Sequence, residues 1–467
     1  MTPEEFRRHG RALIDWIADY VETIERHPVA SPVAPGAVRA ALPPHPPTSP
    51  EPFDVVLADL DRVIVPGLTH WQHPSFFAYF PANSSYESIL GELASAGLGV
   101  NGMLWATSPA ATELERLMLD WMVDLLALPA RFRNDGGVGG GVIQGTASEA
   151  TLCAILAARE RATSGITNRH GVIGGLVAYT TAEAHSSVEK GLRIAGIGSD
   201  NLRHVPTDDA FAMRPDALTD AIKSDRVDGL VPFLVVATAG STSSMAFDPV
   251  SEIGEICRRE NVWLHVDAAM AGIAALASAH RFVNAGLEQA DSYCTNPHKW
   301  MGVNFDCDLF WVADRTALTS ALSILPEYLR TAATDAGTTV DLRDWGVPLG
   351  RRFRALKLWF TIRSLGVADV QAMIERHIAL AGEVARWVDD DGRFLLAAPP
   401  ALNLVCFRHI DGDAATDRVI TEANASGQAL FTRTVLGGRS AIRFCVGGRR
   451  TEARHVEAGW KLLQSLA

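Results

Sequence analysis

Short apolar segments alternate with helical patterns through the middle of this chain. The apolar runs lie at 175–180, 230–238, 262–266, 291–295 and 308–313, and helical patterns lie between several of them. Strands separated by helices pair in parallel, and helices then cover both faces of the sheet. The sequence therefore predicts an α/β fold with a mostly parallel sheet. In such sheets ligands bind beyond the carboxyl ends of the strands.

The two ends of the chain differ from this middle part. Residues 3–26 carry apolar side chains at helical spacing, and the proline-rich segment 28–52 indicates an extended strap. A helix followed by such a strap often packs on a second subunit, so we predict a homodimer. A lid on the same subunit is the alternative. Helical patterns at 352–364, at about 368–389 and at 451–466 indicate a smaller α+β domain at the C-terminus.

A chain of 467 residues exceeds the usual size of one hydrophobic core. We divide it into an N-terminal helical and strap segment (1–84), a large domain (85–365) and a small C-terminal domain (366–467). The net charge of −12 and the lack of basic runs argue against a nucleic-acid-binding protein.

The sequence also predicts a cytoplasmic location. Its six cysteines form no CxxC pair, which favours reduced thiols over a disulfide framework or a zinc site. The first residues lack the apolar core of a signal peptide. The uncharged stretches 93–112 and 229–247 are broken by glycine, proline or hydroxyl residues, so buried loops or strands explain them better than membrane spans.

Four chemical groups follow the predicted strands. The strand "VWLHV" runs into Asp267, and "DSYCT" runs into "NPHK" with Lys299. We expect a glycine-rich loop at the start of "GGGVIQGTASEA"; the segment then opens a helix whose free N–H groups would hold an anion. The segment "AEAHSSVEKG" places His185 at another loop-to-helix junction. Each signal alone has a simpler reading, since such groups are often turns, caps or surface residues.

Together the four groups suit one cofactor, pyridoxal 5'-phosphate (PLP). PLP requires an anion site for its phosphate, an amine for covalent attachment and a carboxylate that keeps its pyridine nitrogen protonated. Lys299 would supply the amine, Asp267 the carboxylate, and His185 a flat group against the ring. Burial and a nearby pyridinium would lower the pKa of such a lysine and favour nucleophilic attack.

Five segments, "NPHKW", "HVDAAMAG", "QGTASEATL", "AEAHSSVEKG" and "PLGRRFRALKLWF", resemble the group II PLP-dependent decarboxylases, in particular the aromatic-L-amino-acid decarboxylase branch. The similarity covers nearly the whole chain. It implies a type I (aspartate aminotransferase-like) fold with a mostly parallel, seven-stranded type of sheet. It also implies an obligate homodimer with active sites at the subunit interface. The activity implied is that of a carboxy-lyase that converts an aromatic L-amino acid, such as tryptophan, tyrosine, DOPA or phenylalanine, into the arylalkylamine and carbon dioxide.

The resemblance also implies roles for individual residues. Catalytic residues by this match are Lys299, Asp267, His185 and His298. The same four contact the cofactor, together with Thr146, Ala147, Ser148, Thr242, Ala269 and Asn296. The substrate-pocket positions are Trp71, Tyr79, Phe80, Pro81, Asn101, Met103, Leu342 and Gly350.

The chain departs from the family pattern in the predicted lid loop, 327–345. The family has a proton-donating tyrosine where "VDLRDW" has Leu342, and leucine has no proton to give. Either His185, His298 or a water protonates the substrate carbon, or that carbon reacts with oxygen. The alternative function is therefore decarboxylation coupled to oxidative deamination, which yields an aromatic aldehyde.

The predicted pocket differs as well. Asn101 and Met103 stand where relatives usually have larger or more apolar groups, and the amide needs a hydrogen-bond partner. Gly350 leaves room for a bulky ring. We rank three other readings lower: an aminotransferase that uses Arg443, a non-catalytic protein on an enzyme fold, and a metal site at "HWQH".

Overall fold

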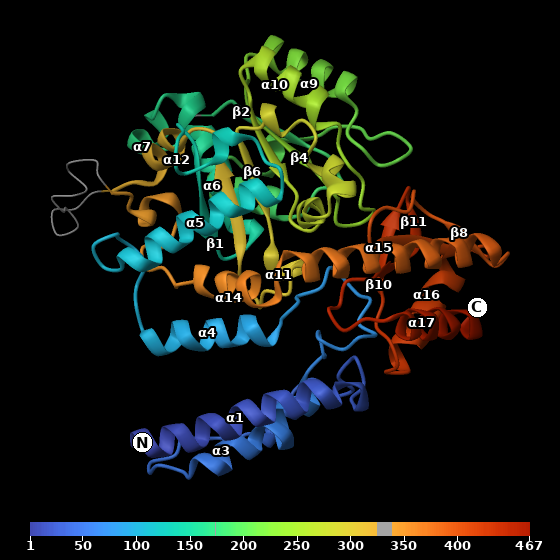
Figure 1. Cartoon of the computed structure of the whole chain (residues 1–467). Coiled ribbons are helices and arrows are strands. Elements are labelled where there is room, and N and C mark those ends of the chain that lie inside the picture. The colour runs from blue at the N-terminus through green and yellow to red at the C-terminus, as the bar shows by residue number, and fades with distance from the viewer. Residues whose placement is uncertain (173, 325–338) are drawn as a thin grey trace. The chain divides into compact units, whose positions relative to one another are not determined.

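The computed structural model describes residues 1–172, 174–324 and 339–467 (Figure 1). The chain separates into two compact units. The larger one comprises residues 82–382 and 398–405, and the smaller one combines residues 1–81, 383–397 and 406–467. The division at residues 84 and 365 expected from the sequence stays a prediction.

The larger unit is built on a seven-stranded sheet with the order β1-β7-β6-β5-β4-β2-β3. All neighbouring strands are parallel except β7, which runs antiparallel to both β1 and β6. The predicted mostly parallel sheet is thus confirmed. The strands are β1 (Gly140–Gln144), β2 (Leu176–Thr180), β3 (Leu202–His204), β4 (Val231–Thr238), β5 (Trp263–Asp267), β6 (Ser292–Thr295) and β7 (Asp308–Val312).

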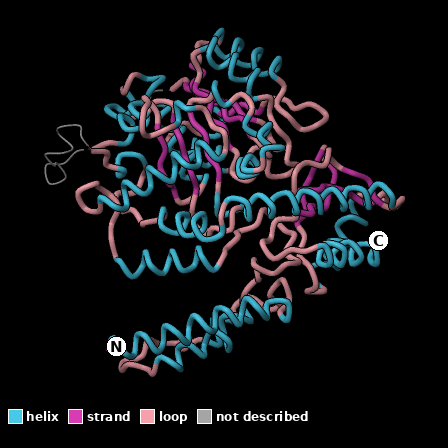
Figure 2. The backbone as a smooth tube through the Cα atoms, viewed as in Figure 1, coloured by secondary structure: helices cyan, strands magenta, loops and turns pink. Residues whose placement is uncertain are grey.

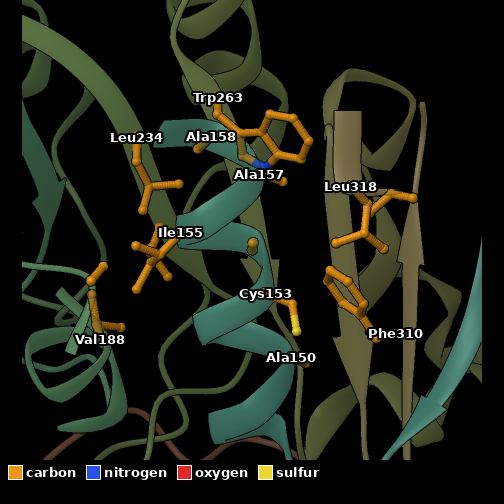
Figure 3. Packing of buried hydrophobic residues seen from close by; sticks show 14 of the residues in the cluster. Ala150, Cys153, Ile155, Ala157, Ala158, Val188, Leu234, Trp263, Phe310 and Leu318 are labelled. Atoms are coloured by element: carbon orange, nitrogen blue, oxygen red, sulfur yellow. The ribbon is translucent and has the colours of Figure 1, made fainter. Parts of the chain in front are cut away.

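Helices cover both faces of this sheet, as the apolar character of its strands requires. On one face α6 (Ala147–Thr163), α8 (Ser187–Ile194) and α12 (Arg315–Leu322) pack on the strands around a buried cluster, part of which Figure 3 shows. Helix α6 approaches closely because it presents small side chains to the sheet. These are Ala147, Ala150, Cys153, Ala154, Ala157 and Ala158.

The other face is covered by α5 (Pro109–Leu125) and α10 (Val250–Glu260), with α9 (Pro215–Val227) beside α10. The tube in Figure 2 shows these helices flanking the strands. Further helices of the described part are α4 (Tyr86–Leu98), α7 (Ile166–His170), α11 (Pro297–Trp300) and α14 (Ala355–Leu365), and α15 (Val367–Asp390) crosses the unit boundary. Several 3-10 turns join these elements, among them Ala271–Leu276, Ser278–Asn284 and Leu342–Trp345.

The smaller unit begins with α1 (Pro3–Thr23), whose first turn is closed by a capping box between Thr2 and Glu5. It continues through α2 (Ala37–Ala41) and α3 (Phe53–Asp59). The later elements include α16 (Asp413–Ala425), α17 (Ala453–Leu466) and strands of a second sheet with the order β10-β11-β9-β8. Those strands are β8 (Phe394–Leu396), β9 (Leu404–His409), β10 (Thr432–Leu436) and β11 (Arg439–Cys445).

Two local expectations were wrong. The glycine-rich segment before α6 is strand β1 rather than a loop, because its glycines serve close packing. A Cβ atom at Gly141 would lie 2.5 Å from Cδ1 of Trp311, and one at Gly139 would overlap the carbonyl oxygen of Arg131. The proline-rich strap contains the short helix α2, formed in the proline-free run between Pro35 and Pro43.

None of the helices in the described ranges combines the length and the apolar character needed to cross a membrane. The uncharged stretch 229–247 contains the buried strand β4, and 93–112 contains the end of α4 and the start of α5.

Candidate active site

The carboxyl edge of the large sheet gathers the groups that the sequence singles out. Asp267 ends β5, and Asn296 follows β6 and precedes α11, which carries Lys299. The loop after β2 carries His185. Asp267 lies opposite Cys294 in the parallel β5–β6 register, so both strands finish at this edge. The charges of Asp267 and Lys299 both act on His185, which brings the three groups into one site.

Asp267 is almost fully buried. Its Oδ1 accepts a hydrogen bond of 3.0 Å from the Ala269 N–H and lies 3.9 Å from the Cys294 Sγ. Lys299 is half-buried, and its carbonyl oxygen accepts a hydrogen bond of 2.7 Å from Nδ2 of Asn83. A buried carboxylate near an amine is the arrangement that holds a cationic ring covalently tethered nearby.

Burial favours the uncharged form of both histidines of the site. Burial, reinforced by the charge of Lys299, lowers the pKa of His298 to about 3. Burial also lowers the pKa of His185, where Asp267 opposes the shift and Lys299 adds to it. The backbone N–H groups of Cys307 and Ser187 donate to the Nδ1 atoms of His298 (2.9 Å) and His185 (3.2 Å), respectively. Each neutral ring therefore carries its proton on Nε2.

The start of α6 forms an anion cradle. Thr146 is the N-cap residue in extended conformation, and its side chain makes no capping hydrogen bond. The N–H groups of Ala147 and Ser148 in the first turn have no helical acceptor, and the positive end of the helix dipole lies there. Next to β6, Oδ1 of Asn296 is buried without a hydrogen-bond partner among the described residues. The free N–H groups at the start of α6 fit a phosphate, because phosphate oxygens accept hydrogen bonds and the helix dipole favours an anion there.

The remaining cofactor positions lie around this edge. Thr242 is exposed in the turn after β4, and Ala269 is half-buried behind Asp267. The structure thus places the predicted cofactor residues on the loops and helix ends that follow β1, β2, β4, β5 and β6.

Predicted substrate residues of the smaller unit form an aromatic group. Trp71 and Tyr79 stack with ring centroids 5.5 Å apart, and both rings are exposed. The guanidinium of Arg443 lies 5.1 Å from the centroid of the Phe80 ring. Tyr79 has a positive φ of 52°, which is uncommon for an aromatic residue and typical of functional positions. Pro81 follows Phe80 and is the last residue of the first segment of this unit.

Predicted substrate residues of the larger unit are held by backbone contacts. The Asn101 amide has its partner within the chain, because Oδ1 accepts a hydrogen bond of 2.9 Å from the Arg351 N–H. A Cβ atom at Gly350 would lie 3.7 Å from Nδ2 of Asn101, so the two residues are neighbours. The carbonyl oxygen of Met103 accepts a hydrogen bond of 3.0 Å from the Arg343 N–H.

Leu342, directly before Arg343, is buried in the core. Its side chain is 1% exposed and belongs to the apolar cluster between α6, α12 and the sheet. Only the end of the predicted lid loop, from residue 339 onward, falls within the described residues.

Sequence reasoning missed one buried acid at this edge, Asp308, the first residue of β7. Its signal was a charged residue directly before the apolar run "LFWV", in a strand that the helices of both faces bury.

A lysine on the short helix after one parallel strand, a carboxylate at the end of the neighbouring strand and an anion cradle at a helix start define a PLP-dependent enzyme of the type I fold. Residues 35–410 match the family model described as "Pyridoxal-dependent decarboxylase conserved domain". The chain belongs to this family, and PLP is its cofactor.

Similar proteins span the full chain. Tryptophan decarboxylase 2 of Oryza sativa subsp. japonica is 44% identical over 478 residues, covering 100% of this chain and 95% of that protein. Aromatic-L-amino-acid decarboxylase of Bos taurus is 44% identical, with 100% and 97% covered. Phenylacetaldehyde synthase of Arabidopsis thaliana is also 44% identical, with 100% and 96% covered. The crystal structure of Oryza sativa TDC with PLP and tryptamine superposes with a TM-score of 0.97 at 39% identity, covering 100% of this chain and 98% of that one.

The protonation of His298 gives a first prediction. Its pKa is lower in the folded chain than the usual 6.5, so below about pH 6.5 the unfolded chain binds the proton first. Stability should fall with decreasing pH between about 6.5 and 3, by up to about 1.4 kcal/mol per pH unit. Nitrogen NMR of labelled histidine should show the neutral Nε2–H form of His298 at pH 6, with His298→Gln to assign the signal. A protonated ring at that pH would contradict the prediction.

Proposed function

We propose that this chain is an aromatic-L-amino-acid decarboxylase, a carboxy-lyase that releases carbon dioxide and an arylalkylamine. The observation that carries the proposal is the joint placement of Lys299, Asp267 and His185 at one sheet edge in a chain of this family. Relatives named tryptophan, tyrosine and aromatic-L-amino-acid decarboxylases support the aromatic substrate class.

We assign the cofactor roles as follows. When bound, PLP supplies an electron sink that weakens the bond between the substrate carbon and its carboxyl group. Lys299 provides the amine that attaches the coenzyme, and Asp267 keeps the pyridine nitrogen protonated. His185 lies against the ring, and the uncharged His298 holds a proton on Nε2 for the reacting carbon. The phosphate is held by Thr146, Ala147, Ser148 and Asn296, with Thr242 and Ala269 lining the site.

Two groups of residues are assigned to the substrate. The exposed rings of Trp71 and Tyr79, with Phe80 and Pro81, offer π faces to an aromatic side chain. In the larger unit, the small Gly350 leaves space beside Nδ2 of Asn101. We place Asn101, Met103 and Gly350 against the substrate ring, where the amide N–H group favours a ring that carries a hydrogen-bond acceptor.

The test is product analysis of the PLP-loaded chain with L-tryptophan, L-tyrosine, L-DOPA and L-phenylalanine. At least one of them should give carbon dioxide and its amine in equal amounts. Lys299→Ala should lower the rate by about 10³-fold or more, because it removes the group that attaches the coenzyme. Lys223→Ala, an exposed lysine on α9, is the matched control and should keep full activity. Carbon dioxide release from none of the four substrates would refute the substrate class.

A second candidate function is the aldehyde synthase. It is favoured by Leu342, which stands where the family has a tyrosine, and by the similar phenylacetaldehyde synthase. This reaction consumes one O₂ and one water for each amino acid. It releases the aldehyde, carbon dioxide, ammonia and hydrogen peroxide. An amine as the only organic product under air would exclude it.

Two substitutions at one position test the role of Leu342. If the chain forms aldehyde, Leu342→Tyr should raise the ratio of amine to aldehyde by about tenfold or more, because the hydroxyl can protonate the substrate carbon. Leu342→Phe adds a ring of similar size without the hydroxyl and should leave the ratio unchanged. Both variants disturb the core cluster that holds Leu342, so comparing their products separates proton donation from packing. Equal product ratios in the two variants would contradict the role of position 342.

We further propose that the chain forms a homodimer. Helix α4 exposes the apolar side chains of Tyr86, Leu90 and Leu93 at a spacing of four and three residues, which places them on one helix face. In the smaller unit, α1 and α3 also expose apolar residues, among them Phe6, Ile14, Val55 and Val56. Exposed apolar faces of this kind support an interface with a second copy.

The dimer is tested by replacing Leu90 and Leu93 with glutamate. Two charges on the α4 face should convert the dimer to a monomer, as measured by sedimentation, because unpaired charges are costly to bury. Val227→Glu introduces a charge at an exposed apolar residue outside α4, at the end of α9, and should leave the dimer intact. A wild-type chain that sediments as a monomer would contradict the proposed homodimer.

We place the chain in the cytoplasm. All six cysteines are buried and free of disulfides, which supports a reducing compartment.

A further inference from the structure

Three buried histidines of the smaller unit, His70, His73 and His455, have no role in the assignments above. Each of them is at most 6% exposed. Burial of an imidazole favours its neutral form, because the charged form loses its hydration. A cavity of about 450 Å³ is lined by His73 and His455, together with Glu25, His27 and other residues. Water therefore reaches this histidine cluster without unfolding of the unit.

One member of the cluster contacts the N-terminal arm, which we define as residues 3–27. The Tyr20 hydroxyl on α1 lies 2.7 Å from Nδ1 of His70. The ring of His27, at the end of the arm, stacks on the His70 ring with centroids 4.9 Å apart. The His70 N–H also donates a hydrogen bond of 2.8 Å to the carbonyl oxygen of Val29. His70 therefore holds both α1 and the turn that follows it.

A second contact joins the arm to the start of α17. The two carboxylate oxygens of Glu25 accept hydrogen bonds of 2.7 Å from the guanidinium of Arg454. Oε2 of Glu25 also lies 3.3 Å from Nε2 of His455. The Glu452 N–H donates a hydrogen bond of 3.0 Å to Nδ1 of His455, which is part of the cap of α17. The arm is thus bound to a helix start that a histidine helps to close.

The hydrogen bonds of two of these rings require the neutral form. Nδ1 of His73 accepts a hydrogen bond of 3.0 Å from the Ser75 N–H, and Nδ1 of His455 accepts from the Glu452 N–H. A backbone N–H only donates, so each neutral ring carries its proton on Nε2. A second proton would enter at Nδ1, opposite a donor, and would break that hydrogen bond. Protonation therefore weakens the contacts around the arm.

The charges around the cluster come from α1, the turn after it, the segment 70–75 and the region of α17. The charged and titratable groups are Tyr20, Glu25, Arg26, His27, His70, His73, Arg450, Glu452, Arg454 and His455. Burial lowers the pKa of His70 and His455, and it lowers the pKa of His73 to about 4. Glu25 opposes the shifts of His73 and His455, but its carboxylate is already paired with Arg454.

We propose that the histidine cluster is an acid-sensitive switch: its neutral rings hold the N-terminal arm on the smaller unit, and their protonation releases the arm. The switch involves neither PLP nor the substrate, so it goes beyond the proposed function. Each ring binds a proton less readily in the closed state than in the released one. The contribution of His73 to closure is therefore complete above about pH 6.5 and is lost as the pH falls to about 4.

The first experiment determines where the rings carry their protons. In the PLP-loaded chain at about pH 7.5, the nitrogen chemical shifts of His73 and His455 should be those of neutral rings protonated on Nε2. The variants His73→Asn and His455→Asn assign the two signals. A ring protonated on Nδ1 at this pH, alone or in addition to Nε2, would overturn the proposal.

The second experiment measures release of the arm by amide hydrogen exchange at about pH 7.5 and about pH 5, corrected for the intrinsic exchange rates. Helix α1 should lose about tenfold or more of its protection at the lower pH, since the lowered pKa of His73 alone accounts for a change of that size. Strand β11 of the same unit should keep its protection. Unchanged protection of α1, or an equal loss in β11, would overturn the proposal.

Replacement of two rings connects the release to the cluster. The side-chain oxygen of asparagine can replace Nδ1 as an acceptor but takes up no proton, so we combine His73→Asn with His455→Asn. The ratio of α1 protection between the two pH values should shrink by about fivefold or more. Loss of packing acts at both pH values and cancels in this ratio. If the double variant does not fold, His73→Asn alone should shrink the ratio by about threefold or more. A ratio equal to that of the wild type would overturn the proposal.

The matched control is His265→Asn in the larger unit. His265 is also fully buried, and burial lowers its pKa to about 4. This variant should keep the wild-type response of α1 to pH, because His265 does not contact the arm. A response lost in His265→Asn would assign the pH dependence to general acid unfolding and overturn the switch. None of these measurements follows decarboxylation, so their failure is distinct from failure of the proposed function.

Discussion

The parallel pairing of β4, β5 and β6 is the constraint on which the site depends. Residues 238 and 267 pair across β4 and β5, and residues 267 and 294 pair across β5 and β6. Parallel strands in this register end together, so residues far apart in the sequence reach one edge without long side chains. The antiparallel β7 extends the same edge from the opposite direction, because its first residue lies where its neighbours end.

Burial governs the electrostatics of this edge. It is the largest cause of the lowered pKa of His185 and His298 and of the raised pKa of Asp308. Burial thus favours the neutral form of each of these three groups. Charges near them act strongly, because little water screens the field inside the protein.

The sequence predicted the sheet and the cofactor groups well, since both follow from local signals. Apolar runs bounded by helical patterns locate strands, and residues such as Asp267 or Lys299 stand out where a strand ends. Strand β1 was missed because successive glycines are typical of a turn. Glycine is needed there because the β1 backbone approaches the Trp311 side chain closely. The burial of Leu342 and of Asp308 depends on packing between distant segments, which local patterns do not encode.

The alanine-rich face of α6 has a consequence for how the protein can vary. The depth at which this helix lies on the sheet is set by side chains such as Ala150, Ala154 and Ala157, none larger than a methyl group. A bulkier residue at any of them would lift the helix and carry its first turn away from Asn296. We therefore expect the sheet-facing positions of α6 to tolerate few substitutions, even in turns that touch no ligand. Coenzyme affinity then depends on the size of the side chains packed between α6 and the sheet.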